Sequence, residues 1–382
     1  MEIVAIKGII KDYPWGNDYF IPGLLGIRKG GIMAEYWLGT HPSGDAFLSD
    51  GTKLSDYISS DLEGALGPDN ASRYNHLPLL LKILAVEKPL SLQCHPDKAQ
   101  AIRGWKEEEG VRRKGGICNY QDDNKKAELL YALTPLTALC GFLPLGEIID
   151  NLKRSVPSSY ESFLSSFSDE IGRIVFRLYS LSPEQKHMIL EEFKKNIAAS
   201  SMPVADGSFL TLRGVAGKCM DEHPGDIGII FTLLMNIVHL CPGEALYMKP
   251  DTMHAYVSGN AVELMDASDN VLRGGLTRKR CDVDELMRIM DTSTLSIEKI
   301  VPSSSCGVSL LRTPSDTFTL ARMEKGVYEH RSRTGIVIVL DGSLSIRGGG
   351  ELDLGKGEAA FIPYSSECTL DVDGVVFEAL IP

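Results

Sequence analysis

Residues 79–98 read LLLKILAVEKPLSLQCHPDK, and this stretch carries the main fold signal and the first chemical signal of the chain. The apolar run 79–86 is short, which is typical of a buried strand. Similar short runs, at 34–39 and 129–133, are separated by Gly, Pro, Asn and Asp. Residues 1–143 therefore predict an antiparallel β domain with short strands.

The sequence pattern changes at about residue 144. Ser182 begins an S-P-E-Q sequence typical of a capped helix start, and apolar residues then recur at helical spacing up to Ile197. Residues 148–152 and 158–167 also predict helix. The β pattern returns after Pro224, and Asp282 precedes a short predicted helix at 286–290. We therefore expect a helical insertion, 144–224, between two parts of one β domain, 1–143 and 225–295.

The C-terminal part, residues 296–382, predicts a second β domain. Asp341-Gly342 is typical of a hairpin turn between strands at 336–340 and 343–346. Many short strands joined by such turns favour a jelly-roll barrel. The predicted fold is thus mainly β, with tandem barrels and a helical insertion.

The segment after His95 is predicted to form a helix that starts at Pro96 and continues through residue 102. The following segment, 106–116 (KEEEGVRRKGG), is highly charged and ends in paired glycines. A solvated surface loop explains this composition, and so does a mobile lid over a site. The sequence leaves both interpretations open.

Composition excludes several classes of partner. The chain has 382 residues with a formal net charge of −12, which opposes long-range attraction to nucleic acid or to an anionic membrane. No apolar run approaches the roughly 20 residues of a membrane span. Its eight cysteines form no CxxC pair, and the first residues lack a secretory pattern. We expect a cytoplasmic protein with reduced thiols.

Gln93 and His95 are the first candidate metal ligands. Residues two apart in a strand point to the same side, so both can face one cavity while Cys94 points away. An amide oxygen and an imidazole form a plausible half of a metal site. The pattern is weak alone, because a lone His is more often a core or surface residue.

His254 follows a turn built on Pro250 and Asp251, and Tyr256 lies on the same side of the predicted strand. The imidazole is either a metal donor at the mouth of a barrel or a hydrogen-bonded barrel residue. Residues 273–280 read RGGLTRKR, with four basic side chains in an acidic protein. This segment fits an anion site, for example for phosphate, or a solvated turn. The sequence has no Walker-type GxxxxGK[ST] motif.

Together these segments resemble the type I mannose-6-phosphate isomerases, a family of cupin-fold zinc enzymes. The resemblance includes YPWG at 13–16, AEYWLGTHPSG at 34–44, residues 79–98 and residues 254–279, in the family order. It implies a catalytic cupin domain with a helical insertion, followed by a C-terminal cupin-like β domain. It also implies an aldose–ketose isomerase that interconverts mannose 6-phosphate and fructose 6-phosphate through an enediol intermediate.

The resemblance implies one Zn²⁺ per chain, with four ligands at Gln93, His95, Glu128 and His254. Ligand types alone would also suit iron, cobalt or manganese. The third family motif, NHKPE, is altered here to NKKAE at 124–128: Lys125 replaces the His, and Ala127 replaces the Pro. The metal-ligand Glu and the adjoining lysine are retained.

The resemblance also suggests roles for other residues. Arg273 matches the active-site arginine and suits charge stabilisation, because a guanidinium stays cationic. Lys279 and Lys126 match positions that line the site, whereas Lys98 and Lys82 are further candidate substrate contacts. The candidates for proton transfer are Glu263 and Tyr256. The sequence does not decide between them, and a structural ion pair is the alternative for Glu263.

Three other functions remain open from the sequence. They are a cupin isomerase for another sugar phosphate, a non-catalytic sugar-binding cupin, and an iron-dependent cupin dioxygenase. The dioxygenase would leave the basic segment 273–280 without an evident purpose. The expected partner is a small sugar phosphate, and we expect a monomer.

Overall fold

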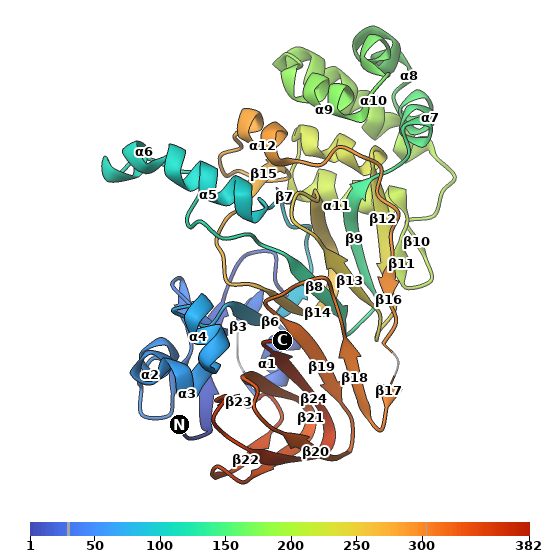
Figure 1. Ribbon diagram of the computed structural model, residues 1–382. Helices are drawn as coiled ribbons and strands as arrows, with labels where there is room; N and C mark the ends of the chain where they lie inside the picture. The colour runs from blue at the N-terminus through green and yellow to red at the C-terminus, as the bar shows by residue number, and fades with distance from the viewer. Residues whose placement is uncertain (29–30, 303) are drawn as a thin grey trace.

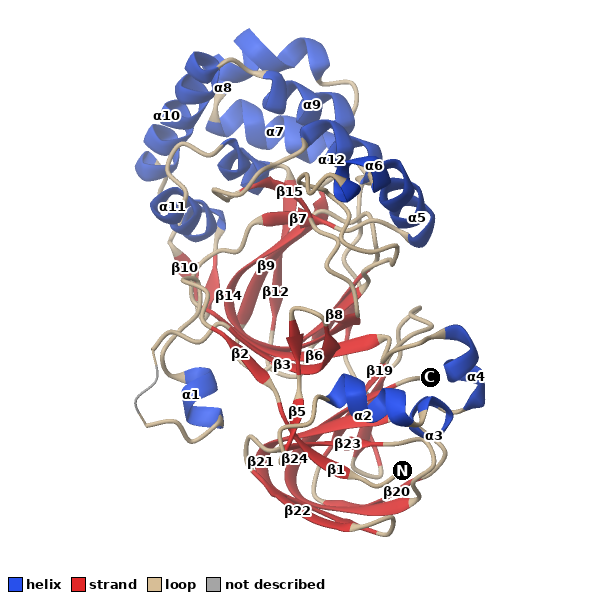
Figure 2. Cartoon of the chain, turned by 90° about the vertical axis from the view of Figure 1, so that its left-hand side faces the viewer, coloured by secondary structure: helices blue, strands red, loops and turns tan. Residues whose placement is uncertain are grey.

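The computed structural model describes residues 1–28, 31–302 and 304–382. Two large antiparallel sheets follow one another along the molecule, and helices gather at the far end of the larger sheet (Figure 1; Figure 2). The predicted fold class, mainly β with tandem cupin-type barrels and a helical insertion, is confirmed. Within the described ranges, no helix is long and apolar enough to cross a membrane.

The larger sheet carries most of the predicted site residues. Its strands are β2 (Ile9–Lys11), β3 (Glu35–His41), β4 (Gly44–Asp45), β6 (Leu79–Val86), β7 (Leu92–Cys94), β8 (Glu128–Ala132), β9 (Leu136–Phe142), β12 (Met235–Leu240), β13 (Ala245–Met248), β14 (His254–Asp266), β15 (Leu272–Gly275) and β16 (Lys299–Ile300). The long strand β14 pairs with β6, β7, β8 and β9. The three short strands predicted near residues 34, 79 and 129 are β3, β6 and β8, so this prediction is confirmed.

Strand β6 is buried along its whole length because both of its faces are covered. Leu79, Leu81 and Ile83 belong to an apolar layer shared with the smaller sheet, whereas Leu84 packs in the interior of the larger one. Side chains alternate along a strand, so Lys82 shares the inward face of Leu84. The apolar run 79–86, interrupted only by Lys82, thus reflects a strand with two covered faces. Lys82 lies on its inward face.

The smaller sheet contains strands from both ends of the chain. They are β1 (Val4–Lys7), β5 (Phe47–Leu48), β17 (Ser304–Ser305), β18 (Val308–Leu311), β19 (Thr319–Met323), β20 (Gly326–His330), β21 (Gly335–Arg347), β22 (Glu351–Gly355), β23 (Ala359–Ile362) and β24 (Cys368–Leu380). Val4 of β1 lies opposite Phe361 of β23, and Ile6 lies opposite Leu48 of β5. Strands β1 and β5, from the N-terminal part of the chain, are therefore added to a sheet whose other strands come from the C-terminal part.

The helices cover one end and one side of these sheets. They are α1 (Phe20–Leu24), α2 (Leu54–Ser60), α3 (Leu62–Leu66), α4 (Pro68–Arg73), α5 (Lys98–Glu107), α6 (Glu109–Arg113), α7 (Leu145–Ser155), α8 (Pro157–Ser159), η1 (Tyr160–Leu164), η2 (Ser165–Phe167), α9 (Ile171–Ser180), α10 (Pro183–Ala199), α11 (Leu212–Glu222), η3 (Ile227–Leu233) and α12 (Val283–Ile289). A small hairpin, β10 (Ala205–Asp206) with β11 (Phe209–Leu210), precedes α11. Ser182 and Gln185 form the predicted capping box of α10, which confirms that helix start.

The hairpin predicted at Asp341-Gly342 is wrong. These residues lie inside the continuous strand β21, where the register with β24 shifts between Val339 and Asp341. Gly342 has φ 75°, and it lies opposite Gly374, which has φ 145°. Each glycine closely approaches the opposing backbone, so a side chain on either would clash. The β-bulge lies at Leu340, and the Asp-Gly pair that follows continues the strand instead of making a turn.

The helix predicted after His95 is confirmed as α5, but its start and the loop interpretation of residues 106–116 are wrong. The helix begins at Lys98, after an Asp97 cap that forms a capping box with Gln100, so Pro96 lies outside it. The charged segment is also largely helical, as the end of α5 and α6, and not a loop. Arg112 packs 3.1 Å from the ring centroid of Trp105, which ties the second helix to the first.

Candidate metal centre

Neighbouring strands bring the predicted metal ligands together from distant parts of the chain. Gln93 on β7 lies opposite His254, the first residue of β14, and also opposite Arg273 on β15. His95 directly follows β7, and Glu128 begins β8. Cys94 points into the apolar core, so the side chains alternate here as expected for a strand.

Glu128 forms the centre of this cluster. Its two carboxylate oxygens lie 3.2 Å from Nε2 of His95 and 3.2 Å from Nε2 of His254. Candidate ligand atoms of the three residues lie within 4.8 Å of one another, and all three side chains are buried. Gln93 lines the same cavity beside Glu128 and His254.

The protonation of the two histidines makes the cluster suitable for a cation. Nδ1 of His95 lies 2.8 Å from the Asn270 carbonyl, and Nδ1 of His254 lies 2.9 Å from the Thr252 carbonyl. A carbonyl only accepts, so each Nδ1 carries a proton and each ring turns its Nε2 toward Glu128. In a neutral ring that Nε2 presents a lone pair. Burial lowers the pKa of His95 to about 4, which disfavours an imidazolium.

The cluster therefore needs a positive charge between its ligand atoms. Nε2 of His95 is buried without a hydrogen-bond partner among the described residues, although it faces the carboxylate of Glu128. Two lone pairs facing a buried carboxylate repel it, and a divalent cation among them removes the repulsion. Histidine, carboxylate and amide donors fit zinc, with room for a further ligand in the cavity.

A chain of charged and polar groups extends from Glu128 along the cavity wall. Lys126 Nζ lies 3.1 Å from Glu128, and the hydroxyl of Tyr256 lies 3.0 Å from Glu128 and 2.8 Å from Glu263. Lys82 Nζ is 2.9 Å from Glu263. Burial and the two carboxylates hold the pKa of Tyr256 well above its usual range, so it stays a hydrogen-bond donor.

The cationic state of Lys82 is also fixed by its surroundings. Burial alone would lower the pKa of this lysine, but the carboxylates of Glu263, Glu35 and Glu128 outweigh that effect and raise it. Although burial would raise the pKa of Glu128, the ammonium group of Lys126 holds it well below its usual range. Both groups are therefore charged at neutral pH.

These residues line one cavity of about 570 Å³, a suitable size for a small metabolite. Arg273, Lys279 and the neighbouring Arg278 line the same cavity. Burial lowers the pKa of Arg273, and burial with the nearby Arg273 charge lowers the pKa of Lys279. In both shifts, the attraction of nearby carboxylates does not outweigh the effect of burial. The two positive charges therefore remain available to bind an anion.

Lys98 is the predicted residue that the fold does not bring into this cavity. Its ammonium group is about half exposed, 2.8 Å from Asn124 and 3.5 Å from Asp123. The altered motif position Lys125 also points elsewhere, to Asp316 of the C-terminal part. At the second altered position, the N–H of Ala127 donates to the buried carboxylate of Asp266 at 2.8 Å. A proline there could not make this hydrogen bond.

Several cavity residues were not assigned a role from the sequence. Glu35, Trp37 and His41 alternate along β3, and all three side chains point into the cavity. Trp37 Nε1 donates to Glu35, and Nε2 of His41 lies 3.3 Å from Asp269. The signal was present in the motif at 34–44, where the polar and aromatic residues recur at every second position.

Comparison with known proteins gives a consistent result. A family model described as the catalytic domain of type I phosphomannose isomerase matches residues 4–145. The chain is 30% identical to mannose-6-phosphate isomerase of Shigella flexneri, over 96% of this chain and 95% of that one. It is 29% identical to mannose-6-phosphate isomerase of Bos taurus, over 99% and 98% of the two chains.

Solved structures agree over the whole chain. The crystal structure of mannose 6-phosphate isomerase from Salmonella typhimurium, bound to fructose 6-phosphate and zinc, superposes with a TM-score of 0.89. The sequences are 27% identical, and the match covers 99% of each chain. A second structure, of mannose 6-phosphate isomerase with zinc and yttrium, gives a TM-score of 0.88 at the same identity and coverage.

Proposed function

The chain belongs to the mannose-6-phosphate isomerase family, and on this premise we propose that it is a zinc-dependent aldose–ketose isomerase acting on mannose 6-phosphate and fructose 6-phosphate. The observation that carries the proposal is the pair of Nε2 lone pairs that face the buried carboxylate of Glu128. A divalent cation bound between the three side chains would make this arrangement favourable. The related Salmonella typhimurium enzyme binds zinc and fructose 6-phosphate.

Four residues would hold the zinc: Gln93, His95, Glu128 and His254. They contribute one negative charge, so the loaded centre keeps a net charge of about +1. Bound zinc would act as a Lewis acid toward a substrate oxygen. The carbonyls of Asn270 and Thr252 would keep the two imidazoles in the ligating tautomer.

The isomerisation moves a proton between C1 and C2 through an enediol intermediate, and it needs a base inside the cavity. Glu263 is our candidate for this base, because it is buried and because the hydroxyl of Tyr256 lies between its carboxylate and that of Glu128, a proposed zinc ligand. Tyr256 stays protonated and donates to Glu263, which orients the carboxylate. Lys82 supplies a fixed positive charge 2.9 Å from the same group.

Other basic residues would bind charge on the substrate. Arg273 lies opposite Gln93 in the sheet, so its guanidinium suits the negative charge that develops near the reacting carbons. Lys279 and Arg278 line the same cavity and would bind the phosphate. Lys126, 3.1 Å from Glu128, is buried where it can donate to a substrate oxygen. Lys98 is left out, because it lies outside the cavity.

We also propose a domain organisation for the chain. Residues 1–143 and 225–295 would form the catalytic unit, with 144–224 as the helical insertion and 296–382 as the C-terminal β domain. Strands β1 and β5 then belong to the first part by sequence and to the last part by pairing. This overlap links the two β domains.

Metal removal tests the proposed function. Dialysis against a chelator is expected to abolish interconversion of the two sugar phosphates, and one equivalent of Zn²⁺ is expected to restore it. A panel of hexose phosphates in the same assay tests the substrate. Full activity in protein shown to be metal-free would overturn the mechanism, and faster turnover of another hexose phosphate would overturn the substrate assignment.

A further inference from the structure

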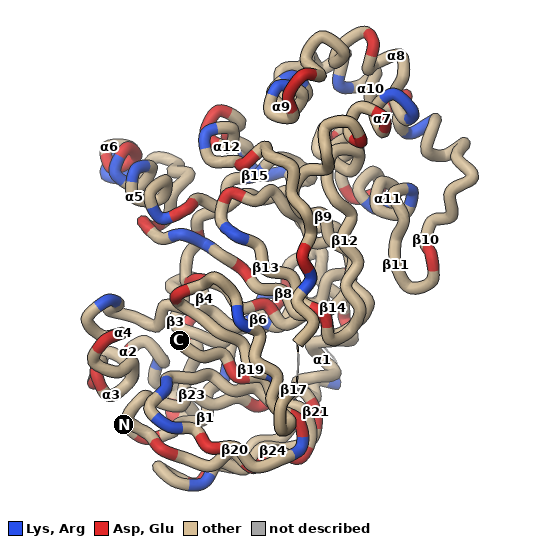
Figure 3. Tube along the Cα trace, turned by 45° about the vertical axis from the view of Figure 1, so that its right-hand side comes forward, with Lys and Arg blue, Asp and Glu red and all other residues tan. Residues whose placement is uncertain are grey.

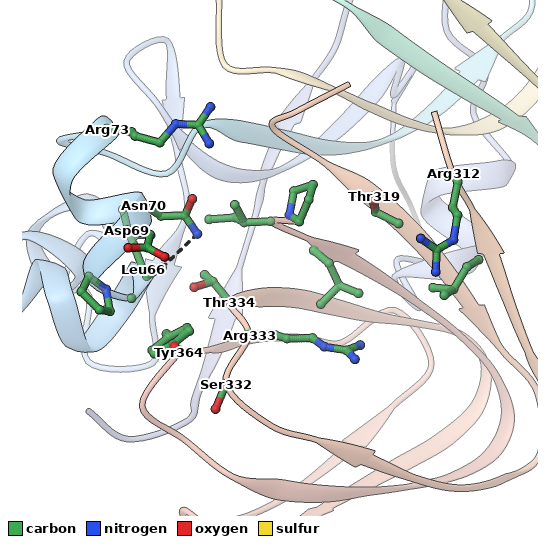
Figure 4. A pocket seen from close by; sticks show the side chains of 16 residues that line it. Leu66, Asp69, Asn70, Arg73, Arg312, Thr319, Ser332, Arg333, Thr334 and Tyr364 are labelled. Atoms are coloured by element: carbon green, nitrogen blue, oxygen red, sulfur yellow. Dashed lines mark hydrogen bonds between the residues drawn. The ribbon is translucent and has the colours of Figure 1, made fainter. Parts of the chain in front are cut away.

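A second cavity, of about 610 Å³, lies away from the metal centre, between helices α3 and α4 and the C-terminal sheet. Figure 4 shows its lining side chains. Its walls come from the helices near Arg73, from Arg312 just after β18, and from residues 332–334 between β20 and β21. The segment 380–382 closes another side. The proposed isomerase mechanism uses none of these residues.

Three arginines line this cavity in a chain whose net charge is −12. Arg73 is 3.0 Å from Asp316, whereas the guanidinium groups of Arg312 and Arg333 have no ion-pair or hydrogen-bond partner among the described residues. Figure 4 shows these two groups extending toward the same side of the cavity, one from a strand end and one from a turn. Asp69 is the only acidic side chain among the described lining residues.

The remaining lining offers two further kinds of contact. Asn70, Thr319 and Tyr364 present amide and hydroxyl groups, which suit sugar hydroxyls. Leu310, 38% exposed, and Leu380 provide an apolar surface of the kind that packs against a ring. Guanidinium groups prefer the planar, bidentate geometry of phosphate oxygens.

The turn that presents Arg333 is held by a buried ion pair. Nε2 of His330 lies 3.0 Å from the Arg333 carbonyl, and its Nδ1 lies 2.7 Å from Glu378. Both His330 and Glu378 are buried, and Ser332 within the turn has φ 48°. These contacts fix a backbone conformation that non-glycine residues seldom adopt, so the turn is a built feature of the fold.

We propose that this cavity is a second, non-catalytic binding site for an organic phosphate with a hydroxyl-bearing ring. Nucleoside diphosphates and sugar phosphates share this chemistry. The volume lies within the range of pockets that enclose a drug-sized ligand, about 300–1,000 Å³. Arg312 and Arg333 would bind the phosphoryl oxygens, and the amide, hydroxyl and apolar groups would bind the sugar and the ring.

The test is calorimetric titration of the zinc-loaded, full-length protein with ADP, GDP, fructose 6-phosphate and inorganic phosphate. We expect one equivalent of nucleoside diphosphate, or a second equivalent of fructose 6-phosphate beyond the catalytic one. The double variant Arg312→Gln/Arg333→Gln is expected to weaken that binding roughly tenfold or more. Its isomerase kcat and melting temperature should not change, because both side chains are exposed and neither lines the candidate metal-site cavity.

Arg331→Gln is the matched control, since Arg331 lies in the same exposed turn but pairs with Glu329 and does not line the cavity. It should bind every probe like the unmodified protein. The separate titrations identify which ligand class the cavity binds. The double variant should lose the binding of nucleoside diphosphates if they are the ligands, or the second equivalent of fructose 6-phosphate if sugar phosphates are. The proposal is overturned if no organic phosphate binds outside the catalytic site at millimolar concentration. It is also overturned if the double variant binds them unchanged, or if inorganic phosphate binds as tightly as every organic phosphate.

Discussion

The ammonium group of Lys125 lies 2.5 Å from a carboxylate oxygen of Asp316. This contact joins the segment that carries the proposed metal ligand Glu128 to residues 296–382. Lys125 occupies the position where the family motif has His, and its side chain points away from the candidate site toward Asp316. The same carboxylate group also pairs with Arg73. The altered motif residue thus links the segment before strand β8 to Asp316, far away in the sequence.

The first prediction compares Lys125 with its neighbour. Lys125→Ala is expected to keep kcat within about twofold and to lower the free energy of unfolding by at most about 1 kcal/mol, because the ion pair is partly exposed. Lys126→Ala should lower kcat by about 100-fold or more, since Lys126 is buried against Glu128. Steady-state kinetics and urea denaturation of both variants check this. Equal kcat losses in the two would contradict the assignment.

A second prediction separates metal binding from proton transfer. Glu128→Gln removes the central anionic ligand, so the purified protein should lose zinc and activity together. Glu263→Gln should retain one equivalent of zinc and lose kcat by about 10²-fold or more, because Glu263 lies outside the ligand cluster. Elemental analysis beside kinetics distinguishes them. A Glu128→Gln protein with a full zinc equivalent would contradict the ligand set.

The third prediction concerns the hydroxyl between the two carboxylates. Tyr256→Phe leaves Glu128 and Glu263 without their shared donor, so the base should lose its orientation. We expect kcat to fall about 10- to 100-fold, with zinc retained and a changed pH profile of kcat. The pH profile is the decisive measurement. A uniform rise of KM with unchanged kcat would show instead that the hydroxyl only binds substrate.

The fourth prediction uses the remaining motif difference. Ala127→Pro would restore the family residue but remove the N–H that donates to Asp266. Asp266 is buried, so the lost hydrogen bond to its carboxylate should cost about 1–3 kcal/mol of unfolding free energy. Chemical denaturation measures this loss. Asp266→Asn alone is the control, because its side-chain oxygen can still accept the Ala127 N–H.

A fifth prediction concerns pH. Burial raises the pKa of Asp251 to about 6, with Asp97 adding to the shift, and one of its oxygens is buried with no hydrogen-bond partner in the described part of the chain. The native state therefore binds more protons than the unfolded state between about pH 4 and 6, so stability falls as pH rises through this window. Above pH 6 the ionised carboxylate destabilises the fold.

Asp251→Asn is expected to remove this pH-dependent loss. Asn also tolerates the φ of 68° at this position. The variant should gain roughly 1–2 kcal/mol over the unmodified protein at pH 7.5 and little at pH 4. Denaturation at both pH values tests the sign. A larger gain at the lower pH would show that the carboxylate stabilises the fold when ionised.

Local patterns predicted those parts of the structure that depend on local chemistry. The capping residues of α10 and the alternation around Gln93 are set by neighbours within a few residues. The continuous strand through Asp341 and Gly342, with its bulge at Leu340, could not be predicted in this way, because pairing with β24 decides between strand and turn. The outward direction of Lys98 depends on Asp123 and Asn124, more than twenty residues away.

Motif resemblance supplied Glu128 and Arg273, which strand periodicity alone does not mark. The inward face of β3, with Glu35 and His41, lies within the motif at 34–44, but the motif alone indicates no role for these side chains. Its significance depends on the partner strand β6, which carries Lys82 beside Glu35. Contacts between strands that lie far apart in the sequence cannot be predicted from the spacing of residues within one segment.

Pairing of β1 with β23 has a consequence for protein synthesis. Val4 and Phe361 are separated by more than about 350 residues, so β1 emerges from the ribosome long before its partner is translated. During elongation its unpaired edge is a site for wrong pairing, and the nascent chain must keep it free or transiently covered. Residues 296–382 alone do not complete this sheet, because β1 and β5 supply two of its strands. An extension fused before β1 would therefore disturb a sheet whose other strands lie near the opposite end of the sequence.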